Sequence, residues 1–373
     1  MVSKIILRLK QMRIVFLLCV FRAATLVFKS KSWLICERGT EARDNGYAFY
    51  KYMKTNHPER KVYYLITKKS ADYCRVKEDA VLYNSIKSYW IVATCEKIIS
   101  AHYASVIPIT VGHKIFHLFR LYDKFYFLQH GVTKDDQKSL YAKVAPMRLF
   151  VCGARPEYDD VKAKYNHPQG VVRYTGLARF DGLQSFITHN QILVMPTWRT
   201  YISDKETFLT SDYYHRWQGM LLDEKLRDLL QMNNLRLVFY AHYEMQKYAK
   251  YFTTCSDNIV VASFDEYDVQ TLLKESKLLI TDYSSVFFDF AYMKKPTLFY
   301  QFDKYHYAKG YFDYLKHGFG KVCSEHDVLI ESIEKVVANN FRLEPIYAER
   351  IDRFFPLHDA LNCERIYHAI IET

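Results

Sequence analysis

Two histidines stand directly after short apolar runs and are the first candidates for chemistry. His130 lies in Leu128-Gln-His-Gly131, and His242 ends Leu237-Val-Phe-Tyr-Ala-His242. Gly131 is expected to let the backbone turn sharply, so that His130 projects from the fold. Because histidine titrates near neutral pH, one ring can take a proton from a hydroxyl while the other supports a leaving phosphate. Any single one of the chain's 14 histidines is more often structural, so this pattern only nominates the pair.

A second candidate is the serine pair Ser284 and Ser285. It lies between an apolar run over 278–281 and a helical pattern over 286–293. Unpaired N–H groups at a helix start, with hydroxyls beside them, favour a pyrophosphate. Asp289, one turn further, is placed to accept a ribose hydroxyl. The structural alternatives are an ordinary helix cap and an exposed helix residue.

The third candidate is the segment that follows the apolar run Gln191–Met195. It offers the hydroxyl of Thr197 and the guanidinium of Arg199, whose planar fork of donors suits phosphate. The alternative is a turn in which Trp198 packs and Arg199 forms a surface ion pair. Thr197, Arg199, Ser284, Ser285 and Asp289 are therefore the predicted donor-binding set.

Alternating β-rich and amphipathic runs must position these residues. The expected strands of a first series are Ser32–Cys36, Val62–Thr67, Ala80–Tyr83, Lys97–Ser100, Phe125–Gln129, Leu149–Cys152 and Val171–Thr175. A second series comprises Gln191–Met195, Leu235–Tyr240, Asn258–Ala262, Leu278–Thr281 and Pro296–Tyr300. The expected helices are Asn45–Asn56, Ile86–Thr94 and Arg155–Tyr165, then Asp223–Met232, Glu244–Tyr251, Asp268–Glu275, Ser284–Met293 and Asp327–Asn339. Such alternation is typical of parallel sheets wrapped by helices.

The fold class predicted is therefore α/β, with two Rossmann-like domains facing a cleft and ligands at the carboxyl ends of the strands. The turn-rich stretch 181–190 separates the two series. We expect an N-terminal segment over 1–31, a first domain over 32–185 and a second over 186–373. The final helix is a candidate for crossing back to the first domain.

Composition excludes several classes of protein. The chain has 373 residues, half of them apolar, and few glycines or prolines, so it should fold into more than one core. Its eight cysteines include no CxxC pair, which indicates reduced thiols. No fingerprint of a dinucleotide oxidoreductase, P-loop NTPase, zinc protease or α/β-hydrolase occurs, nor a D-x-D metal triplet, so neither a cofactor nor a metal is expected.

The charge is concentrated at the N-terminus. Residues 1–36 hold seven basic side chains and no acidic one, which leaves 45 basic against 41 acidic residues in the rest. A nucleic-acid partner is not expected, because its basic surface should lie on the folded domains. The apolar run Ile14–Phe28 is interrupted by Arg22 and is too short to cross a bilayer.

Helical spacing puts a partly polar stripe, Lys4, Arg8, Gln11, Val15, Leu18, Arg22, Thr25 and Lys29, on this otherwise apolar N-terminal helix. One interpretation is an interfacial helix that touches an anionic membrane surface. The other, equally weighted, is a helix packed on the first domain with its basic ends solvated. A cleaved secretory signal is a fair rival, because the basic start and the apolar core Ile14–Phe21 fit it, but Arg22 truncates the core and no A-x-A site follows.

Several segments, in order, resemble the CDP-glycerol glycerophosphotransferase family, whose members prime or polymerise teichoic acids and related phosphodiester capsules. The segments are Trp33-Leu-Ile-Cys-Glu-Arg38 with Arg43-Asp-Asn-Gly46, Leu128-Gln-His-Gly-Val-Thr-Lys-Asp-Asp136, Thr175-Gly-Leu-Ala-Arg-Phe-Asp181, Met195-Pro-Thr-Trp-Arg199, Ile280-Thr-Asp-Tyr-Ser-Ser-Val-Phe-Phe-Asp289, Lys295-Pro-Thr-Leu-Phe-Tyr300 and Gly310-Tyr-Phe-Asp-Tyr314. The resemblance runs from about residue 32 to the end.

The resemblance implies a glycosyltransferase-B-like fold that transfers an alditol phosphate, most simply glycerol phosphate, from a CDP-alditol donor. The acceptor would be a hydroxyl of a lipid-linked glycan or polymer, and CMP would leave. It implies that His130 is the general base and that His242, Thr197, Arg199, Ser284 and Ser285 stabilise charge on the pyrophosphate. A peripheral location at the cytoplasmic face of the cell membrane, in cell-wall polymer synthesis, follows from it.

Three alternatives to glycerol phosphate transfer remain open from the sequence. They are ribitol phosphate transfer from CDP-ribitol, glycosyl transfer from a nucleotide sugar on the same fold, and a catalytically silent membrane-bound scaffold. Release of CMP separates alditol phosphate transfer, whether of glycerol or ribitol phosphate, from glycosyl transfer, and any turnover excludes the silent scaffold.

Overall fold

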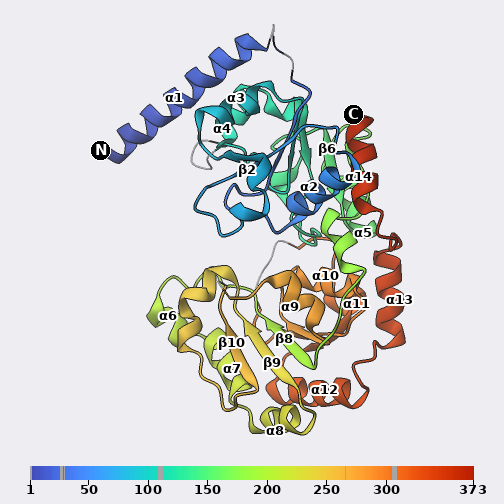
Figure 1. The fold of residues 1–373 in the computed structure, drawn as a ribbon. Coiled ribbons are helices and arrows are strands. Elements are labelled where there is room, and N and C mark those ends of the chain that lie inside the picture. Colours follow the sequence, from blue (N-terminus) through green and yellow to red (C-terminus); the bar gives the residue numbers. More distant parts are fainter. Residues whose placement is uncertain (1, 26–27, 29, 108–111, 265, 305–308) are drawn as a thin grey trace. The chain divides into compact units, whose positions relative to one another are not determined.

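In this computed structural model the chain divides into two compact units, each with its own sheet (Figure 1). The first unit comprises residues 1–132, 137–182 and 359–373, and the second comprises residues 133–136 and 183–358. The structure describes all residues except 1, 26–27, 29, 108–111, 265 and 305–308. The last segment, residues 359–373, thus belongs with the first sheet, and the short segment 133–136, soon after His130, belongs with the second.

The first sheet has seven parallel strands in the order β3-β2-β1-β4-β5-β6-β7. They are β1 (Trp33–Cys36), β2 (Val62–Ile66), β3 (Ala80–Leu82), β4 (Lys97–Ser100), β5 (Phe125–Phe127), β6 (Leu149–Cys152) and β7 (Val172–Tyr174). Trp33 lies opposite Val62 on β2 and opposite Lys97 on β4. The direction of winding reverses between β1 and β4, which is where such sheets bind ligands.

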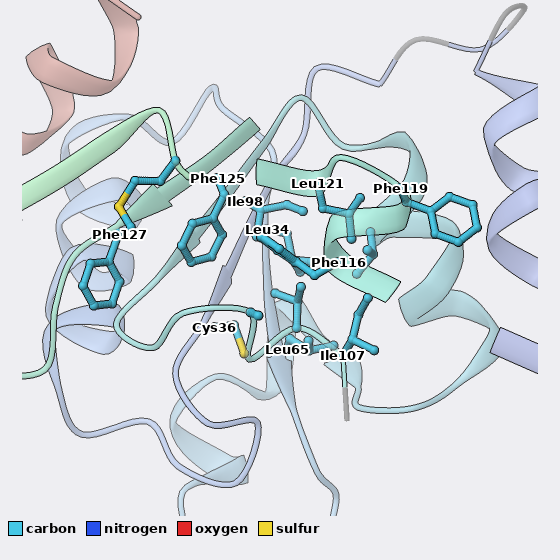
Figure 2. Packing of buried hydrophobic residues seen from close by; sticks show 14 of the residues in the cluster. Leu34, Cys36, Leu65, Ile98, Ile107, Phe116, Phe119, Leu121, Phe125 and Phe127 are labelled. Atoms are coloured by element: carbon cyan, nitrogen blue, oxygen red, sulfur yellow. The ribbon is translucent and has the colours of Figure 1, made fainter. Parts of the chain in front are cut away.

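Helices cover both faces of this sheet. They are α1 (Val2–Ala24), α2 (Asn45–Asn56), α3 (Ile86–Thr94), α4 (Gly112–Leu118), α5 (Arg155–Lys164) and α14 (Asn362–Ile371). Figure 2 shows one core, in which Leu34, Cys36 and Phe125 of the sheet meet Phe116 of α4 and Leu121. These side chains are at most 5 % exposed, so the β-rich residues that favour strands also supply the packing.

The C-terminal helix α14, red in Figure 1, packs beside α2 and β6 of the first unit. The ring of its Tyr367 lies 5.8 Å from that of Trp33 on β1. The buried ammonium of Lys97 donates to the carbonyl of Ile370 at 2.8 Å and to the Tyr126 hydroxyl at 2.7 Å. Helix α14, near the end of the chain, therefore covers part of one face of the first sheet.

The N-terminal helix α1 packs on α3 with one face and exposes apolar side chains on another. Ile14 and Leu18 are buried in the first core, and the ring of Phe21 lies 5.2 Å from that of Trp90. On the outward face Leu9, Met12, Phe16 and Val20 are 48 to 67 % exposed. Ile14 and Leu18 thus face the protein, while the apolar residues of the outward face are exposed to solvent.

The second sheet has six parallel strands in the order β10-β9-β8-β11-β12-β13. They are β8 (Gln191–Met195), β9 (Arg236–Tyr240), β10 (Ile259–Ala262), β11 (Leu278–Thr281), β12 (Thr297–Tyr300) and β13 (Gly320–Cys323). Ile192 on β8 lies between Leu278 on β11 and Leu237 on β9. Counted along the chain, this is the same 3-2-1-4-5-6 order as the first six strands of the first sheet, and it is typical of Rossmann-like domains.

Helices also cover both faces of the second sheet. They are α6 (Lys205–Leu209), α7 (Asp212–Leu221), α8 (Glu224–Met232), α9 (Val269–Glu275), α10 (Val286–Tyr292), α11 (Tyr314–His317), α12 (His326–Ala338) and α13 (Pro345–Phe354). Trp217 of α7 is fully buried on one face, with its ring 5.3 Å from that of Tyr300. A separate aromatic cluster includes Phe287 and Phe288 of α10 with Phe319 and Phe354.

The α/β class with two Rossmann-like domains is confirmed, and all twelve expected strands are present. Strand β13 was not expected. The helix expected over Glu244–Tyr251 is wrong in type, because Tyr243–Tyr251 forms 3₁₀ turns. None of the helices among the described residues is both long and apolar enough to span a bilayer.

Candidate active site

His130 lies just past the carboxyl end of β5, with its side chain exposed. The sharp turn that aims it is made by Gln129, which has φ of +60°, rather than by Gly131. The buried Gln129 side chain donates to the carbonyl of Val151 and to Glu157, and its own carbonyl accepts from Asn45 at 2.8 Å. These bonds hold a backbone conformation that a residue with a side chain rarely adopts.

Charged groups surround the His130 ring and its backbone. Arg179 donates to the His130 carbonyl at 2.8 Å and to the Asp44 carboxylate at 2.6 Å. Desolvation by the surrounding protein lowers the pKa of His130. Asp44 opposes this shift, while the cations Arg179 and Arg38 add to it. A lowered pKa keeps the ring neutral near pH 7, as a general base requires.

A second histidine, His102, stacks on His130. It follows β4, and the two rings lie 5.0 Å apart at an angle of 15°. Burial, with the neighbouring His130 and Arg38, lowers the pKa of His102 to about 2, so this ring is neutral. Its Nε2 accepts a hydrogen bond from Nε of Arg38 at 3.0 Å. The hydrogen of the ring must then be on Nδ1.

The loop that carries Arg38 and Asp44 is fixed by the buried carboxylate of Glu37. Its oxygens accept from the backbone N–H groups of Arg43, Asp44 and Tyr47 at 2.8 to 3.0 Å. Burial, followed by the charge of Asp44, raises the pKa of Glu37 to about 8, although these three N–H groups oppose the rise. These three hydrogen bonds fix the backbone of the loop between β1 and α2.

In the second unit, Thr197 and Arg199 follow β8 and meet Asp282, which follows β11. The backbone N–H of Thr197 donates to Asp282 at 2.8 Å, and Nη1 of Arg199 lies 2.8 Å from the same carboxylate. Asp303 receives two further bonds from Arg199, at 2.7 and 3.1 Å. The Thr197 hydroxyl is buried and has no hydrogen-bond partner among the described residues.

The Arg199 side chain is fully buried, which differs from the surface ion pair considered from the sequence. Although burial opposes its charge, Asp282 and Asp303 raise the pKa of Arg199 above its usual range. Two carboxylates already neutralise this guanidinium, so a phosphate could bind it only by displacing one of them. Arg199 therefore braces the two loops at the winding reversal of the second sheet.

Ser284 and Ser285 lie at the start of α10, as expected. Ser285 is the N-cap and is exposed, but its side chain makes no capping hydrogen bond. The Ser284 hydroxyl accepts a long bond, 3.4 Å, from the backbone N–H of Val286. Asp289 is buried within α10, so it is not an exposed helix residue. The two hydroxyls remain largely available to a ligand.

His242 follows β9, and its ring stacks on that of Trp198 at 6.1 Å. Its Nδ1 accepts from the backbone N–H of Glu244 at 3.3 Å, which leaves the hydrogen on Nε2. The Lys134 ammonium, also in the second unit, lies 2.6 Å from Asp135, and burial lowers its pKa, while Asp135 and Asp282 oppose this shift. Lys134 is thus a buried cation near Asp282.

The structure groups the predicted residues in two sets. Thr197, Arg199, Ser284, Ser285, Asp289 and His242 all belong to the second unit, and His130 belongs to the first. The sequence analysis missed His102, Arg38, Asp44, Arg179, Asp282 and Asp303. Arg38 and Asp44 stand in the segments quoted for the family resemblance, and Asp282 precedes the serine pair. Their position within or beside these motifs was the one signal in the sequence that could have identified them. No cluster of three or more metal-ligating side chains occurs among the described residues.

A cavity of about 500 Å³ lies elsewhere in the first unit, beside the end of α1. Its lining includes Leu18, Phe28, Phe119, Leu121 and Lys124, and it is mostly apolar. It lies near the amino ends of β4 and β5, whereas His130 and His102 follow their carboxyl ends. The cavity is therefore separate from the candidate active site.

Comparison with known proteins gives one consistent family. The model of the CDP-Glycerol:Poly(glycerophosphate) glycerophosphotransferase family matches residues 17–139 and 156–372. The chain is 34 % identical over 369 residues to the minor teichoic acid biosynthesis protein GgaB of Bacillus subtilis, covering 93 % of this chain and 40 % of GgaB. It is 25 % identical over 375 residues to a teichoic acid poly(glycerol phosphate) polymerase of the same organism, covering 94 % and 49 %. The chain thus spans less than half the length of these two relatives.

Solved structures agree on the fold. The wall teichoic acid polymerase TagF superposes with a TM-score of 0.68 at 17 % identity, over 100 % of this chain and 96 % of that one. A putative UDP-N-acetylglucosamine 2-epimerase from Listeria monocytogenes gives 0.57 at 14 %, over 92 % and 98 %. With the family model matched along both units, the chain belongs to the CDP-glycerol:poly(glycerophosphate) glycerophosphotransferase family.

Proposed function

We propose that this protein transfers glycerol phosphate from CDP-glycerol to a hydroxyl of a polymeric or lipid-linked acceptor and releases CMP. The observation that carries this proposal is the family match along both Rossmann-like units. Its support in the structure is the position of the candidate groups, which follow the carboxyl ends of parallel strands in both sheets. The product would extend or prime a teichoic-acid-like or capsular polymer of the cell wall.

In the proposed reaction, the neutral His130 ring takes the proton of the acceptor hydroxyl. The acceptor oxygen then forms a bond to the phosphorus that carries glycerol, and the bond from that phosphorus to the bridging oxygen breaks. CMP leaves with the electron pair of that bond. A general base of this kind contributes about 10²- to 10⁴-fold to the rate.

The donor pyrophosphate is assigned to the second unit. The hydroxyls of Thr197, Ser284 and Ser285 and the Nε2–H of His242 would bind its oxygens, and the buried Lys134 would add positive charge. Asp289 keeps the role of partner for the nucleotide ribose. Arg199 is assigned the indirect role of holding the Thr197 and Asp282 loops in place.

The test is to incubate the protein with CDP-glycerol, CDP-ribitol and nucleotide sugars in turn, with a glycerol-terminated acceptor, and to measure CMP. We expect CMP and an acceptor longer by one glycerol phosphate. Release of CMP from CDP-ribitol but not from CDP-glycerol would mean that the protein transfers ribitol phosphate instead. Release of a nucleoside diphosphate from a nucleotide sugar would replace the proposed reaction with glycosyl transfer.

We also propose that α1 holds the protein at the cytoplasmic face of the membrane. Its outward row Leu9, Met12, Phe16 and Val20 is apolar and exposed, and its sequence is basic without acidic residues. Met12→Gln with Phe16→Gln should reduce sedimentation with anionic phospholipid vesicles and leave folding intact. Unchanged sedimentation would contradict the proposal. Leu18→Gln is the matched inner-row control, since it should destabilise the first core instead.

A further inference from the structure

The cavity beside the end of α1 has no role in the proposed reaction. It measures about 500 Å³, which is within the range of sites that bind small organic molecules. The buried side chains of Leu18 and Leu121 line its inner part, and Phe28, which is 63 % exposed, lines its outer part. Phe119 and Leu121, both labelled in Figure 2, belong to this lining and to the first core. The cavity is therefore an apolar recess that opens to the surface.

The exposed apolar face of α1 leads to this cavity. The backbone N–H of Phe28 donates to the carbonyl of Ala24 at 2.9 Å, a bond between residues that are four apart. Residues four apart lie on one face of a helix, so Phe28 continues the row of Phe16 and Val20. These two side chains are 65 and 48 % exposed and belong to the row that we propose contacts the membrane. The proposed membrane-facing row thus ends at a residue of the cavity.

The charged side chains of the lining are mostly basic. They are Arg22, Lys31, Arg120, Lys124, Glu96 and Asp123. Both carboxylates already have cationic partners. Asp123 pairs with Arg120 at 2.9 Å, and Glu96 pairs at 3.5 Å with Arg60, which lies outside the lining. The remaining charge of the lining is therefore positive.

Three of these cations, Arg22, Lys31 and Lys124, have no carboxylate partner among the residues that the structure describes. Nη1 of Arg22 donates to the carbonyl of Phe119 at 2.5 Å. The Lys124 ammonium donates to two backbone carbonyls at the end of α3, at 2.8 and 2.9 Å. These bonds position the two cations without neutralising them. An apolar recess with such cations in its lining matches a molecule that has a hydrocarbon chain and an anionic group.

We propose that this cavity binds one hydrocarbon chain of an anionic membrane phospholipid, and that Arg22 and Lys31 bind the phosphate of that lipid. The inference rests on the proposed membrane contact of α1, and adds to it a class of lipid and a binding site within the first unit. A chain that leaves the bilayer for this recess exchanges one apolar environment for another, so the phosphate contacts decide which lipids bind. The bound lipid would join α1, α3 and the segment before β5, and would fix how the first unit meets the membrane.

The test uses single-chain amphiphiles at concentrations too low for micelles, so that binding needs no membrane. The probes are dodecyl phosphate, zwitterionic dodecylphosphocholine and inorganic phosphate, and isothermal titration calorimetry measures their dissociation constants. For the wild type we expect dodecyl phosphate to bind at least about tenfold more tightly than dodecylphosphocholine, because its net negative charge meets two unneutralised cations. Inorganic phosphate, which has no chain, should bind much more weakly than either.

Variants of α3 test whether the chain enters the cavity. Ala93 lines the cavity, so Ala93→Trp should fill it and weaken the binding of both amphiphiles at least about tenfold. Ala93→Leu fills less of the volume and should cause a smaller loss. Ile86→Trp is the matched control, because Ile86 is 55 % exposed at the start of the same helix and lies outside the lining. Circular dichroism checks that each variant is folded.

A second pair of variants tests the phosphate contacts. Arg22→Gln with Lys31→Gln should weaken dodecyl phosphate by about tenfold and change dodecylphosphocholine less than about twofold. Lys68→Gln with Lys69→Gln is the control, because it removes the same charge from two exposed residues that follow β2. The control should change the affinity for neither amphiphile.

Vesicles then test whether a membrane lipid occupies the cavity. Phosphatidylglycerol that carries a photoactivatable group near the end of one acyl chain should label residues 119–124 of the wild type, as located by mass spectrometry. Ala93→Trp should lose this label and keep the label on the outward face of α1. A wild type that is labelled on α1 but not at residues 119–124 would overturn the assignment to a membrane lipid.

The binding data separate this inference from the proposed membrane contact. Equal affinity of the wild type and folded Ala93→Trp for dodecyl phosphate would overturn the chain site. Inorganic phosphate that binds as tightly as dodecyl phosphate would reduce the site to one for a small anion and would also overturn it. Binding of dodecyl phosphate that Ala93→Trp abolishes, in a protein that does not sediment with vesicles, would overturn the membrane contact of α1 and leave the chain site standing.

Discussion

The two units share one strand order and use the point of winding reversal in opposite ways. In the first, β1 and β4 lead to Arg38 and His102, which are hydrogen-bonded to each other, and His102 stacks on the exposed His130. In the second, β8 and β11 lead to Arg199 and Asp282, which are fully buried and paired. The same topology can therefore place charged side chains where a substrate binds, or pair them with each other so that they hold two loops together. Which of the two occurs depends on how buried these side chains are and on whether ion-pair partners surround them.

The largest effect is expected from the first unit's histidine. His130→Ala should lower the rate of CMP release by at least about 100-fold, because the proton acceptor is lost. Donor affinity, measured by calorimetry with CDP-glycerol, should stay within about twofold, since the donor residues lie in the second unit. A variant that keeps more than a tenth of the wild-type rate would remove His130 from the mechanism.

The second unit should instead respond in stability. Arg199→Leu leaves the buried Asp282 carboxylate without its cation, and we expect a loss of about 3–5 kcal/mol in the free energy of unfolding. Urea denaturation followed by circular dichroism measures this. The control is Arg155→Leu, which breaks a pair with Asp159 whose side chains are both 56 % exposed and should cost less than about 1 kcal/mol. Similar small losses in both variants would contradict the bracing role.

The serine pair tests whether the second unit binds its ligand through hydroxyls. Ser284→Ala with Ser285→Ala should weaken CDP-glycerol binding by about tenfold, which corresponds to about 1.4 kcal/mol. The cost in stability should be no more than about 1 kcal/mol, because Ser285 makes no side-chain cap bond and that of Ser284 is 3.4 Å long. Unchanged donor affinity would mean that the two serines only begin helix α10 and do not bind the donor.

The last prediction concerns pH and the first unit. The pKa of His102 is about 2 in the folded protein and about 6.5 in an unfolded chain. Below pH 6.5 the unfolded chain binds a proton that the folded ring does not, so stability falls as pH falls, by at most about 1.4 kcal/mol per pH unit. Urea midpoints at pH 7, 6 and 5 should show a shallower decline in His102→Phe. Parallel declines in both proteins would place the protonation elsewhere.

The sheets were predictable because strand signals are local. Runs such as Trp33–Cys36 and Leu278–Thr281 are buried on both faces, so their apolar character is continuous and easily recognised. The short helices α6 and α11, of five and four residues, carry too few turns for a periodic pattern. Strand β13 was missed because its burial is interrupted at Lys321 and Val322.

The site was predictable only as far as each motif ends a strand. The position of Ser284 and Ser285 at a helix start followed from adjacent residues. The burial and pairing of Arg199 could not be predicted, because Asp303 lies 104 residues further along the chain and pairs with it only after folding. His102 gave no signal either, since its role comes from a stack on His130 and a bond from Arg38, which is 64 residues away.

The position of α14 has a consequence for the order of folding during synthesis. The second unit consists mainly of one continuous stretch, residues 183–358, and can close once that stretch has left the ribosome. The first sheet, although made earlier, keeps the face around Trp33 and Lys97 uncovered until residues 362–371 emerge. The unit that begins the chain should therefore be the later one to reach its native state, and its apolar face is the surface that a chaperone would meet.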